Sequence, residues 1–578
     1  MKPVFDSRMI VAAGLVLGSL DAFADPQIDS WFTAFSGKYA RIYTSDAAKS
    51  NGIAVTTWSN GTLTQALPAY AGVQEIDSST NWIYIRTSGL GIHNMGPWYL
   101  DAARAQTFPN LPVNTHALYR IPRQPTVSAT KTINGGGSIG CFVDGVAMFN
   151  SWDAFYWNGS ADVAGGAGGA SGYWNRDAYV NEGVTFDAAY AHQPQDGTYH
   201  YHADPIALRY LLGDHVDYDP ATKTFSESTN AVTRHSPILG WVSDGYPVYG
   251  PYGYANPTND SSGVRRMVSG YILRNGQLGT SNLAAYGRTT IPQWAVRIFN
   301  VSSNQAGPGV STNYPLGRYM EDNDYLGDLG YMQGIDFDLD EHNGRYCVTP
   351  EYPNGIYAYF VAIDSNGVPV FPYNIGRAFY GIPTGGNPGS ISESVTTNFL
   401  GGTNSTIQLS APNLASDTVT LVWSAVEGGI YEVQSSTNLS GWTVLATNVP
   451  SNQTTAACTN STVLDRNFYR VTRTSVASFD PVALAASVAP GGSAARGSVV
   501  TVIITLPTTP PLPPANNIPV SVVLAGNINA SSLSRPSSGT VLATFSIPST
   551  NSATGPQNIV VTFSPAPTYT LTNGFTIN

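Results

Sequence analysis

The chain has few charged residues and no cluster of basic ones. Of its 578 residues only 11 % are charged, the formal net charge is −11, and no run of lysine or arginine occurs. Proteins that bind nucleic acids neutralise phosphates with grouped basic side chains, so the composition argues against nucleic acid as a partner. Hydrophobic residues still amount to 42 %, which is enough to fill several cores and argues against a disordered chain.

Cysteine is scarce as well, since the chain has only Cys141, Cys347 and Cys458. An odd number cannot pair completely within one chain. A disulfide between Cys141 and Cys347 is plausible because both residues fall in one predicted domain, described below. The alternative is that all three are small buried apolar side chains, and the sequence leaves both open.

Long apolar runs are absent after the N-terminus. Lys2 and Arg8 precede an apolar stretch at 9–20, and small residues surround Ala24. This pattern predicts a signal peptide over residues 1–24 that is cleaved near Ala24. The stretch is too short for an ordinary membrane span. We therefore expect a secreted, periplasmic or cell-surface protein without an integral membrane span in the mature chain.

Regular helical periodicity is weak throughout. Short runs rich in Thr, Val, Tyr, Ser and Asn, separated by Gly and Pro, predict a mainly β fold, with an irregular β-rich domain over residues 25–385. The clearest helix candidate lies at 204–213. There Asp204 could cap the helix, Pro205 fits its first turn, and Gly213 ends it.

Two small β-sandwich modules are expected after this domain. Residues 386–406 are rich in Gly, Ser and Asn and predict a linker. Residues 407–475 alternate in strand fashion with regularly spaced aromatics and resemble the fibronectin type III-like modules of secreted bacterial proteins. Residues 476–578 resemble an immunoglobulin-like sandwich. No histidine lies beyond His342, so any histidine chemistry belongs to the first domain.

Histidine is rare but concentrated. The chain has eight, and three of them lie within 192–202, next to the stretch "GTYHYHADP". Because side chains alternate along a strand, His200 and His202 should project to one side and Tyr199 and Tyr201 to the other. Two imidazoles on one face can chelate one metal ion. The alternative is a structural pair, in which one imidazole bonds a backbone carbonyl and the other is exposed.

The segment just upstream completes a candidate ligand set. It supplies Asp187 and His192 ahead of a glycine turn at Gly197. We predict that His192, His200, His202 and Asp187 bind a divalent metal, zinc or copper, since histidine-rich sites suit both. Asp187 would be either a fourth ligand or a partner that fixes one imidazole tautomer.

Two later segments add polar candidates. In "HSPILGWVSDGYPVYGPYGY" (235–254), Asp244 either bonds within its own Asp-Gly turn or, like His235, enters the polar centre. "DFDLDEHNGRYC" (336–347) is an acidic turn that could bind calcium or be purely structural. The residues that could line or support the centre are Tyr199, Tyr201, His235, Asp244, Asp340, Glu341 and His342.

Together with "GSIGCFVDGVAMFNSWDAFYW" (137–157), these blocks resemble the YHYH-domain family of secreted bacterial proteins. The blocks follow one another in order over about 290 residues, from roughly residue 90 to 380. One departure is clear, because the family commonly has a cysteine between the Asp and His of the block that reads "FDAAYAH" here. The resemblance implies a histidine-rich metal-binding signature and no particular reaction.

Three functions are compatible with these features. The first is an exported multidomain protein with a histidine-centred metal site. The second is an extracellular hydrolase that acts on a polymer through a His/Asp centre, although G-x-S-x-G and H-E-x-x-H motifs are absent. The third is a non-catalytic carbohydrate-binding or adhesion protein, because 11 Trp and 33 Tyr suit stacking on sugars of a polysaccharide or cell-surface component.

Overall fold

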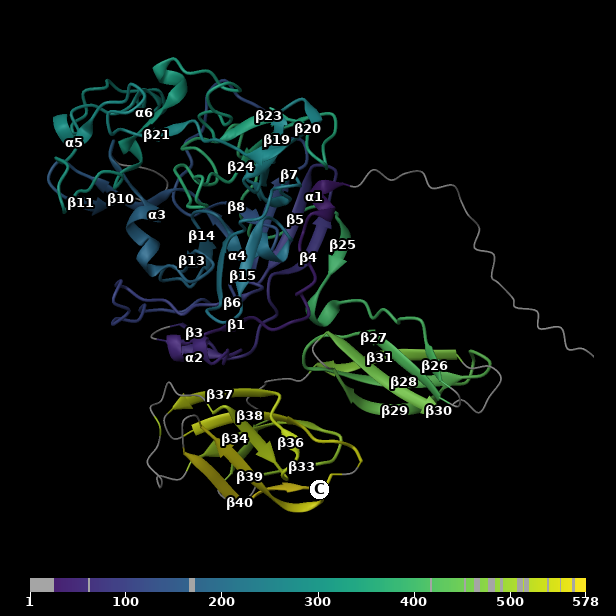
Figure 1. The fold of residues 1–578 in the computed structure, drawn as a ribbon. Coiled ribbons are helices and arrows are strands. Elements are labelled where there is room, and N and C mark those ends of the chain that lie inside the picture. The colour runs from purple at the N-terminus through teal and green to yellow at the C-terminus, as the bar shows by residue number, and fades with distance from the viewer. Residues whose placement is uncertain are drawn as a thin grey trace, which may run out of the picture.

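The fold is mainly β, as predicted, with one large irregular unit and two smaller pairs of sheets (Figure 1). The computed structural model describes residues 25–578 except for 61–62, 166–171, 416–417, 452–453, 462–467, 477–483, 489–491, 507–512, 514–518, 538–539, 551 and 564–566. The predicted signal peptide, residues 1–24, lies outside the described residues. Within the described part of the chain, no helix is long and apolar enough to cross a membrane.

An eight-stranded sheet forms the centre of the large unit. Its order is β13–β14–β9–β8–β17–β18–β24–β23. The bounds are β8 (Ser138–Phe142), β9 (Ala147–Phe149), β13 (Ala191–His192), β14 (His200–Tyr201), β17 (Ile238–Val242), β18 (Pro247–Tyr249), β23 (Gly344–Cys347) and β24 (Ile356–Phe360). Strands β8 and β17 pair antiparallel at the middle, with Cys141 opposite Trp241.

Two Asp-Gly turns close the central hairpins β8–β9 and β17–β18. The Asp144 carboxylate accepts a hydrogen bond from the backbone N–H of Val146 at 3.1 Å, and Asp244 accepts one from Tyr246 at 3.2 Å. The glycines that follow the two aspartates have φ of +84° and +91°, where a side chain would be strained. Asp244 thus bonds within its own turn, one of its two predicted roles.

A second sheet of the large unit includes a segment from its C-terminal end. The order is β25–β4–β5–β7, with bounds β4 (Val73–Ser78), β5 (Trp82–Thr87), β7 (Ala117–Pro122) and β25 (Thr396–Leu400). Strand β25 lies inside the range 386–406, which was expected to be a linker. It pairs antiparallel with β4, and the Thr397 hydroxyl donates to Asp77 at 2.7 Å. This segment is therefore an edge strand of the sheet.

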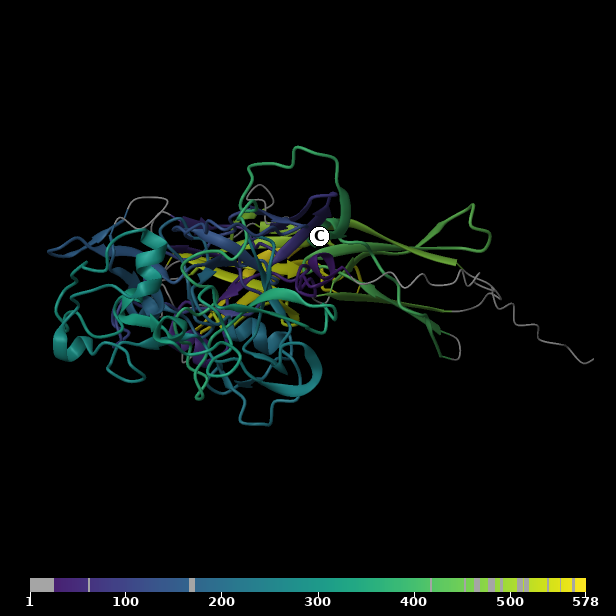
Figure 2. The same cartoon turned by 90° about the horizontal axis from the view of Figure 1, so that it is seen from above.

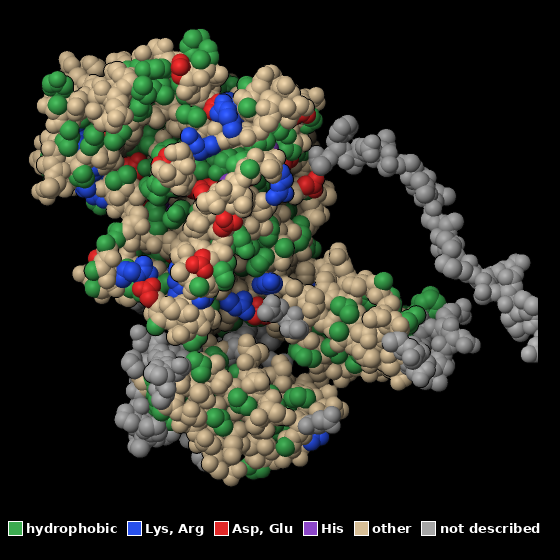
Figure 3. All heavy atoms as spheres, in the orientation of Figure 1, with side chains coloured by type: hydrophobic (Ala, Val, Ile, Leu, Met, Phe, Trp, Pro, Cys, Tyr) green, Lys and Arg blue, Asp and Glu red, His purple; other side chains and the backbone are tan. Residues whose placement is uncertain are grey.

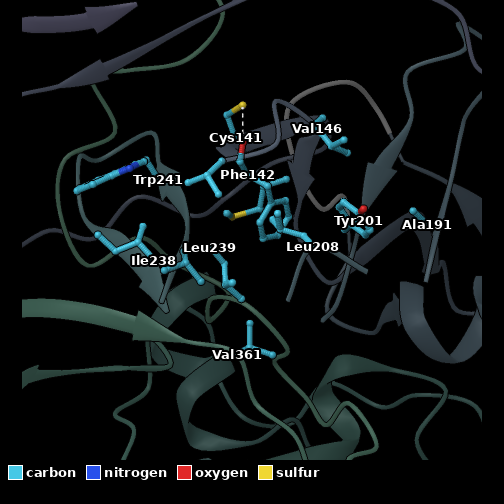
Figure 4. Packing of buried hydrophobic residues seen from close by; sticks show 14 of the residues in the cluster. Cys141, Phe142, Val146, Ala191, Tyr201, Leu208, Ile238, Leu239, Trp241 and Val361 are labelled. Carbon is cyan, nitrogen blue, oxygen red and sulfur yellow. Dashed lines mark hydrogen bonds between the residues drawn. The ribbon is translucent and has the colours of Figure 1, made fainter. Parts of the chain in front are cut away.

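The largest apolar core packs against the central sheet (Figure 4). All three cysteines are free thiols, and Cys141 and Cys347 are completely buried. Of the two alternatives that the sequence left open, the Cys141–Cys347 disulfide is absent, because three strands separate β8 from β23. At the usual strand spacing the two residues are about 19 Å apart, far beyond the roughly 7 Å Cα separation that a disulfide can bridge.

The predicted helix near residue 204 exists, but its start differs from the prediction. Helix α4 (Ile206–Leu211) has Pro205 as its N-cap and receives no side-chain cap. Asp204 instead accepts a hydrogen bond from Arg209 at 2.8 Å. Arg209 is fully buried and also pairs with Asp214 and Glu227. Asp204 is therefore part of a buried ion cluster, where its charge is compensated.

Short helices and small sheets fill out the rest of the large unit. The helices are α1 (Pro26–Asp29), α2 (Asp46–Ser50), α3 (Ala178–Glu182), α5 (Leu283–Tyr286) and α6 (Gln293–Phe299), with 3₁₀ turns η1 (Gly183–Thr185), η2 (Met320–Asp322), η3 (Leu326–Leu329) and η4 (Gly402–Asn404). The small sheets are β1 (Arg41–Ile42) with β6 (Asn94–Met95), β2 (Trp58–Asn60) with β3 (Leu63–Gln65), β10 (Trp152–Trp157) with β11 (Asp162–Ala164) and β12 (Asn175–Asp177), β15 (Val216–Asp219) with β16 (Thr224–Glu227), β19 (Tyr252–Asn256) with β20 (Asn259–Arg266), and β21 (Tyr271–Leu273) with β22 (Asn323–Tyr325).

Two further pairs of sheets follow, each with its own buried core (Figures 1 and 2). The first pair comprises β26 (Asn413–Ala415), β27 (Thr418–Ser424) and β30 (Thr455–Ser461) in one sheet, and β28 (Gly429–Ser436), β29 (Thr443–Pro450) and β31 (Phe468–Val476) in the other. The second pair comprises β32 (Leu484–Val488), β34 (Val499–Thr505), β37 (Ser532–Ser537) and β38 (Thr540–Ser546), and β33 (Gly492–Ala494), β35 (Ser521–Leu524), β36 (Ile528–Asn529), β39 (Gly555–Thr562) and β40 (Thr568–Ile577). This arrangement confirms the predicted fold class.

Charged side chains are sparse on the surface drawn in Figure 3, and basic and acidic groups occur side by side there. Several form exposed or half-exposed ion pairs, for example Arg104 with Asp46 and Arg297 with Asp328. A phosphate-binding face would need basic side chains without such partners. On the face shown, basic side chains thus occur together with acidic ones.

Candidate metal centre

Three histidines lie together on two short neighbouring strands. His192 ends β13 and lies directly opposite His200 of β14, because the chain turns back near Gly197, whose φ is +79°. The Nε2 atoms of His200 and His202 are 2.9 Å apart. One ligand atom of each histidine lies within 4.8 Å of the other two, and none of the three residues is more than 5 % exposed. The structure thus brings His192, His200 and His202 together.

Each imidazole is held through its Nδ1 atom. His200 Nδ1–H donates to the Thr198 carbonyl at 2.9 Å, and His202 Nδ1–H donates to the Asn150 carbonyl at 2.6 Å. His192 Nδ1 lies 2.7 Å from the Thr185 hydroxyl. That hydroxyl donates its own hydrogen to the Glu182 carbonyl at 2.7 Å, so it accepts from His192 Nδ1–H.

This bonding pattern determines which nitrogen can bind a metal. A neutral imidazole carries one N–H, so a proton at Nδ1 leaves a lone pair at Nε2. The Nε2 atoms of all three imidazoles therefore face the same small space, where a cation held between them, either a proton or a metal ion, keeps their lone pairs from repelling one another. Bonding of the distal ring nitrogen to a protein carbonyl or hydroxyl is how metal-binding histidines are commonly oriented.

A glutamate that the sequence interpretation did not include also reaches this space. Glu182 ends helix α3, and its Oε2 lies 3.2 Å from His202 Nε2 and 3.7 Å from His192 Nε2. Histidine spacing gave no reason to choose it. One signal was present, because Glu182 is the only glutamate between Glu75 and Glu227. The centre therefore has three imidazoles and one carboxylate.

Burial and Glu182 together set the protonation states. Burial lowers the pKa of His192 to about 4 and the pKa of His200 well below its usual value. Burial also opposes charge on His202, but the hydrogen bond and charge of Glu182 outweigh it and raise the His202 pKa. Burial would raise the pKa of Glu182, but its bond to His202 lowers it instead. The site therefore favours an ionised Glu182 beside neutral His192 and His200, whereas His202 holds its proton more strongly and must release it when its Nε2 binds a metal.

Aromatic side chains surround the imidazoles. The Phe149 ring stacks on His200 with ring centroids 3.9 Å apart, and the edge of the Phe186 ring meets His192 at 4.9 Å. Such walls keep water away and strengthen electrostatic interactions inside the site. The aromatic shell therefore isolates the donor atoms from solvent.

Asp187 lies on the other side of the strand, away from the three imidazoles. Its Oδ1 accepts from the backbone N–H groups of Ala189 at 2.9 Å and Ala191 at 3.3 Å. Its Oδ2 accepts from the Tyr199 hydroxyl at 2.7 Å and the Gly96 N–H at 2.8 Å. The structure thus places Asp187 with the tyrosine face and does not bring it into the group of ligand atoms.

The tyrosines of the YHYH stretch belong to the apolar core. Tyr199 and Tyr201 are completely buried, opposite to the face that carries His200 and His202. Figure 4 shows Tyr201 among the apolar side chains of this core, near Ala191 of the neighbouring strand. The predicted alternation of histidine and tyrosine faces therefore agrees with the structure.

The remaining predicted residues lie elsewhere and are engaged by protein groups. Asp244 accepts from the Tyr359 hydroxyl at 2.7 Å, and Asp340 accepts from the Tyr357 hydroxyl at 2.9 Å. The other three predicted residues are bound by protein groups as well. His235 Nδ1 bonds to the Ser236 carbonyl, Glu341 pairs with Arg297, and His342 Nδ1 bonds to the Ala378 carbonyl. Among the described residues, the three histidines are the only group of three or more His, Cys, Asp or Glu placed to share an ion.

Comparisons with known proteins give one match. No curated protein and no solved structure matched the chain. Residues 118–371 match the model of a family described as "YHYH protein". This range includes the two Asp-Gly hairpins and all three histidines of the centre. The sequence blocks that resemble the YHYH-domain family are therefore confirmed as a YHYH domain over residues 118–371.

Proposed function

We propose that this exported protein binds one divalent transition-metal ion through His192, His200 and His202, with Glu182 as the fourth ligand. The observation that carries the proposal is the convergence of three buried imidazoles, each held through Nδ1 so that its Nε2 faces the other two. Zinc and copper both accept imidazole and carboxylate ligands, with zinc–nitrogen distances of about 2.0–2.1 Å. A cation at this point relieves the repulsion of the lone pairs and compensates the Glu182 charge.

The setting of the site supports an extracellular role. The N-terminal sequence pattern predicts export with cleavage near Ala24, and the YHYH domain resembles a family of secreted proteins. As part of this proposal, the first C-terminal pair of sheets is a fibronectin type III-like module and the second is an immunoglobulin-like module. Modules of this type carry a catalytic or binding domain to a polysaccharide or cell-surface component, which we propose as the partner.

Elemental analysis of the purified full-length protein tests the metal proposal. We expect about one zinc or copper ion per chain, and none in the double variant His200→Ala/His202→Ala, because two of four ligands are removed. The matched control is His116→Ala, since His116 is exposed and lies outside the centre. A metal-free wild type, or a double variant that keeps its full metal content, contradicts the proposal.

A metal-assisted hydrolase is the second candidate, and one observation favours it. The Glu182 side chain is 28 % exposed, whereas the imidazoles are buried. Catalytic zinc sites keep one position for water, with a nearby carboxylate as general base. In this case Glu182 would take a proton from the water in place of binding the ion. Hydrolysis of polysaccharides, esters or peptides by the wild type and not by His200→Ala/His202→Ala would distinguish this candidate.

A further inference from the structure

The two halves of the eight-stranded sheet have the same arrangement of strands when each is followed from the middle to its outer edge. The hairpins β8–β9 and β17–β18 meet at the middle, and each extends outward through a parallel neighbour, β14 or β24, and then an antiparallel one, β13 or β23. Figure 1 places β14 and β24 on either side of β8. The register at the middle is symmetric too, since Gly140 lies opposite Val242 and Phe142 opposite Gly240.

The sequences of the two hairpins correspond at a constant spacing. "GCFVDGVAMF" begins at Gly140 and "GWVSDGYPVY" begins at Gly240, with Asp-Gly turns at equivalent positions. A Cβ on Gly140 would lie 2.4 Å from the Trp241 carbonyl oxygen, and a Cβ on Gly240 would lie 2.9 Å from the Cys141 carbonyl oxygen. Each glycine therefore allows the same close approach of the opposite hairpin.

The outer strands correspond as well. "DAAYAH" (187–192) matches "DEHNGR" (340–345), and "GTYHYH" (197–202) matches "GIYAYF" (355–360). Asp187 accepts from the N–H groups two and four residues later and from the hydroxyl of Tyr199. Asp340 accepts in the same way from the N–H groups two and four residues later and from the hydroxyl of Tyr357.

We propose that the sheet consists of two copies of one four-strand unit, and that Asp187 is a positioning residue of the first copy rather than a metal ligand. The Asp–Tyr bond occurs in both copies, but ligands occur in only one. The register pairs His192 with His200 and, in the second copy, Arg345 with Ala358. Phe360 takes the place of His202. The metal centre is thus a specialisation of the first copy, an inference that rests on the proposed function.

The Asp187 carboxylate can position both His192 and His200, because it bonds to the residue that precedes each of them. Asp187 Oδ1 holds the N–H of Ala191, which precedes His192, and Oδ2 holds the hydroxyl of Tyr199, which precedes His200. The two bonds connect β13 to β14 beside the ligand pair. Losing them loosens the register between His192 and His200 without removing a donor atom.

The matched variants Tyr199→Phe and Tyr357→Phe test this inference in the full-length protein. Both remove one hydroxyl from a buried Asp–Tyr bond, so we expect similar losses of thermal stability. Only Tyr199→Phe should weaken metal binding, by about tenfold, as for other residues that orient metal ligands. Equal weakening by both variants, or by neither, overturns the positioning role.

Asp187→Asn distinguishes positioning from ligation. With cobalt in the site, the visible absorption of the variant should keep the wild-type band positions while the affinity falls. A shift to the spectrum of a different coordination number identifies Asp187 as a ligand and overturns the inference. If the wild type binds no metal, the proposed function fails, whereas unequal stability losses in Tyr199→Phe and Tyr357→Phe overturn the two-copy inference separately.

A separate observation concerns lysine, of which the chain has only five. Two of these, Lys49 and Lys223, line one cavity of about 150 Å³ together with His93, Tyr43, Tyr218 and Phe225. The described lining contains no Asp or Glu. The Lys223 ammonium group donates to the Ser50 carbonyl at 3.1 Å, and the nearest acidic groups that act on Lys49 are Asp187 and Asp46, outside the lining. The cavity lies on the tyrosine side of β14, because His93 Nε2 lies 3.0 Å from the Tyr199 hydroxyl.

The geometry points to a site for a small anion that carries one aromatic ring, such as an aromatic carboxylate. A cavity of roughly 150 Å³ accommodates one six-membered ring, and the lining supplies four aromatic side chains, Tyr43, Tyr210, Tyr218 and Phe225, that can contact it. The two ammonium groups can compensate a carboxylate. His93 adds an Nδ1 atom that is buried and has no hydrogen-bond partner among the described residues.

Calorimetry with benzoate tests this site, with benzyl alcohol as the uncharged probe. We expect benzoate to bind the wild type, to bind Lys49→Ala/Lys223→Ala at least tenfold more weakly, and to bind more tightly than benzyl alcohol. The control is Lys131→Ala, whose ammonium group contacts Tyr380 outside the cavity. No benzoate binding, equal binding to the double variant, or an equal loss in Lys131→Ala overturns the assignment.

Discussion

We expect the replacement of Glu182 with glutamine to weaken the proposed metal binding by about ten- to hundredfold. The Glu182 carboxylate lies 3.2 Å from His202 Nε2 and 3.7 Å from His192 Nε2, where it can bind the ion directly or compensate its charge. A glutamine keeps the shape of the side chain but not its charge. Losses of about that size accompany the removal of groups close to a bound metal. Competition with a chromophoric chelator at pH 7.5 measures the change.

Glu341→Gln is the matched control for this experiment. Glu341 lies just before β23 and pairs with Arg297 of helix α6, away from the histidines, so we expect its replacement to leave metal affinity unchanged. Unchanged affinity in Glu182→Gln would mean that three imidazoles bind the ion without the carboxylate. Hydrolysis that disappears while the metal content is retained would instead assign Glu182 to proton transfer.

Replacing Asp144 with asparagine stabilises the protein at pH 8 and has little effect at pH 4. Burial raises the pKa of Asp144 from 3.8 to about 7, and its Oδ2 has no hydrogen-bond partner among the described residues. A carboxyl with a raised folded-state pKa holds an extra proton only in the folded state, so its contribution to stability falls as pH rises from about 4 to 7. An asparagine side chain does not ionise, so its contribution to stability does not fall over this pH range. We expect a gain on the order of 2–4 kcal/mol at pH 8.

Burial raises the pKa of the equivalent aspartate, Asp244, as well, but Asp244 makes hydrogen bonds that Asp144 lacks, so we expect its replacement to destabilise the protein. Asp244 Oδ2 accepts from the Tyr359 hydroxyl at 2.7 Å and from the Gly381 N–H at 2.9 Å. An amide group at this position loses at least one acceptor, so Asp244→Asn should cost about 1–3 kcal/mol. Unfolding of both variants at pH 4 and pH 8 measures the contrast. If Asp144→Asn and Asp244→Asn change the stability at pH 8 in the same direction, the explanation from their different hydrogen bonds is contradicted.

The local features of the histidine centre could be predicted from sequence because short-range geometry produces them. Alternation along a strand places His200 and His202 on one face and the tyrosines on the other. The glycine turn before them reverses the chain and brings His192 back beside the pair. The YHYH blocks and the mainly β fold follow from similarly local patterns.

The remaining parts of the centre depend on contacts between distant segments. The Asn150 carbonyl that orients His202 comes from a residue about 50 positions earlier, and the α3 helix that carries Glu182 is ordered by its surroundings. Asp187 has the spacing of a ligand, but its carboxylate bonds to Tyr199 instead. Asp204 has the position of a helix cap, but a buried Arg209 binds it. For both aspartates, a side-chain partner that the local pattern does not reveal, Tyr199 or Arg209, replaces the predicted role.

The pairing of β25 with β4 has a consequence for synthesis of the chain. The hydrogen-bonding edge of β4 is made near residue 75, and the strand that covers it is made more than 300 residues later. An uncovered strand edge can pair with another chain, so the nascent protein carries an open template for aggregation over that interval. The segment around Leu400 is therefore the last part of this sheet to be synthesised, and the sheet is complete only after that segment has paired with β4.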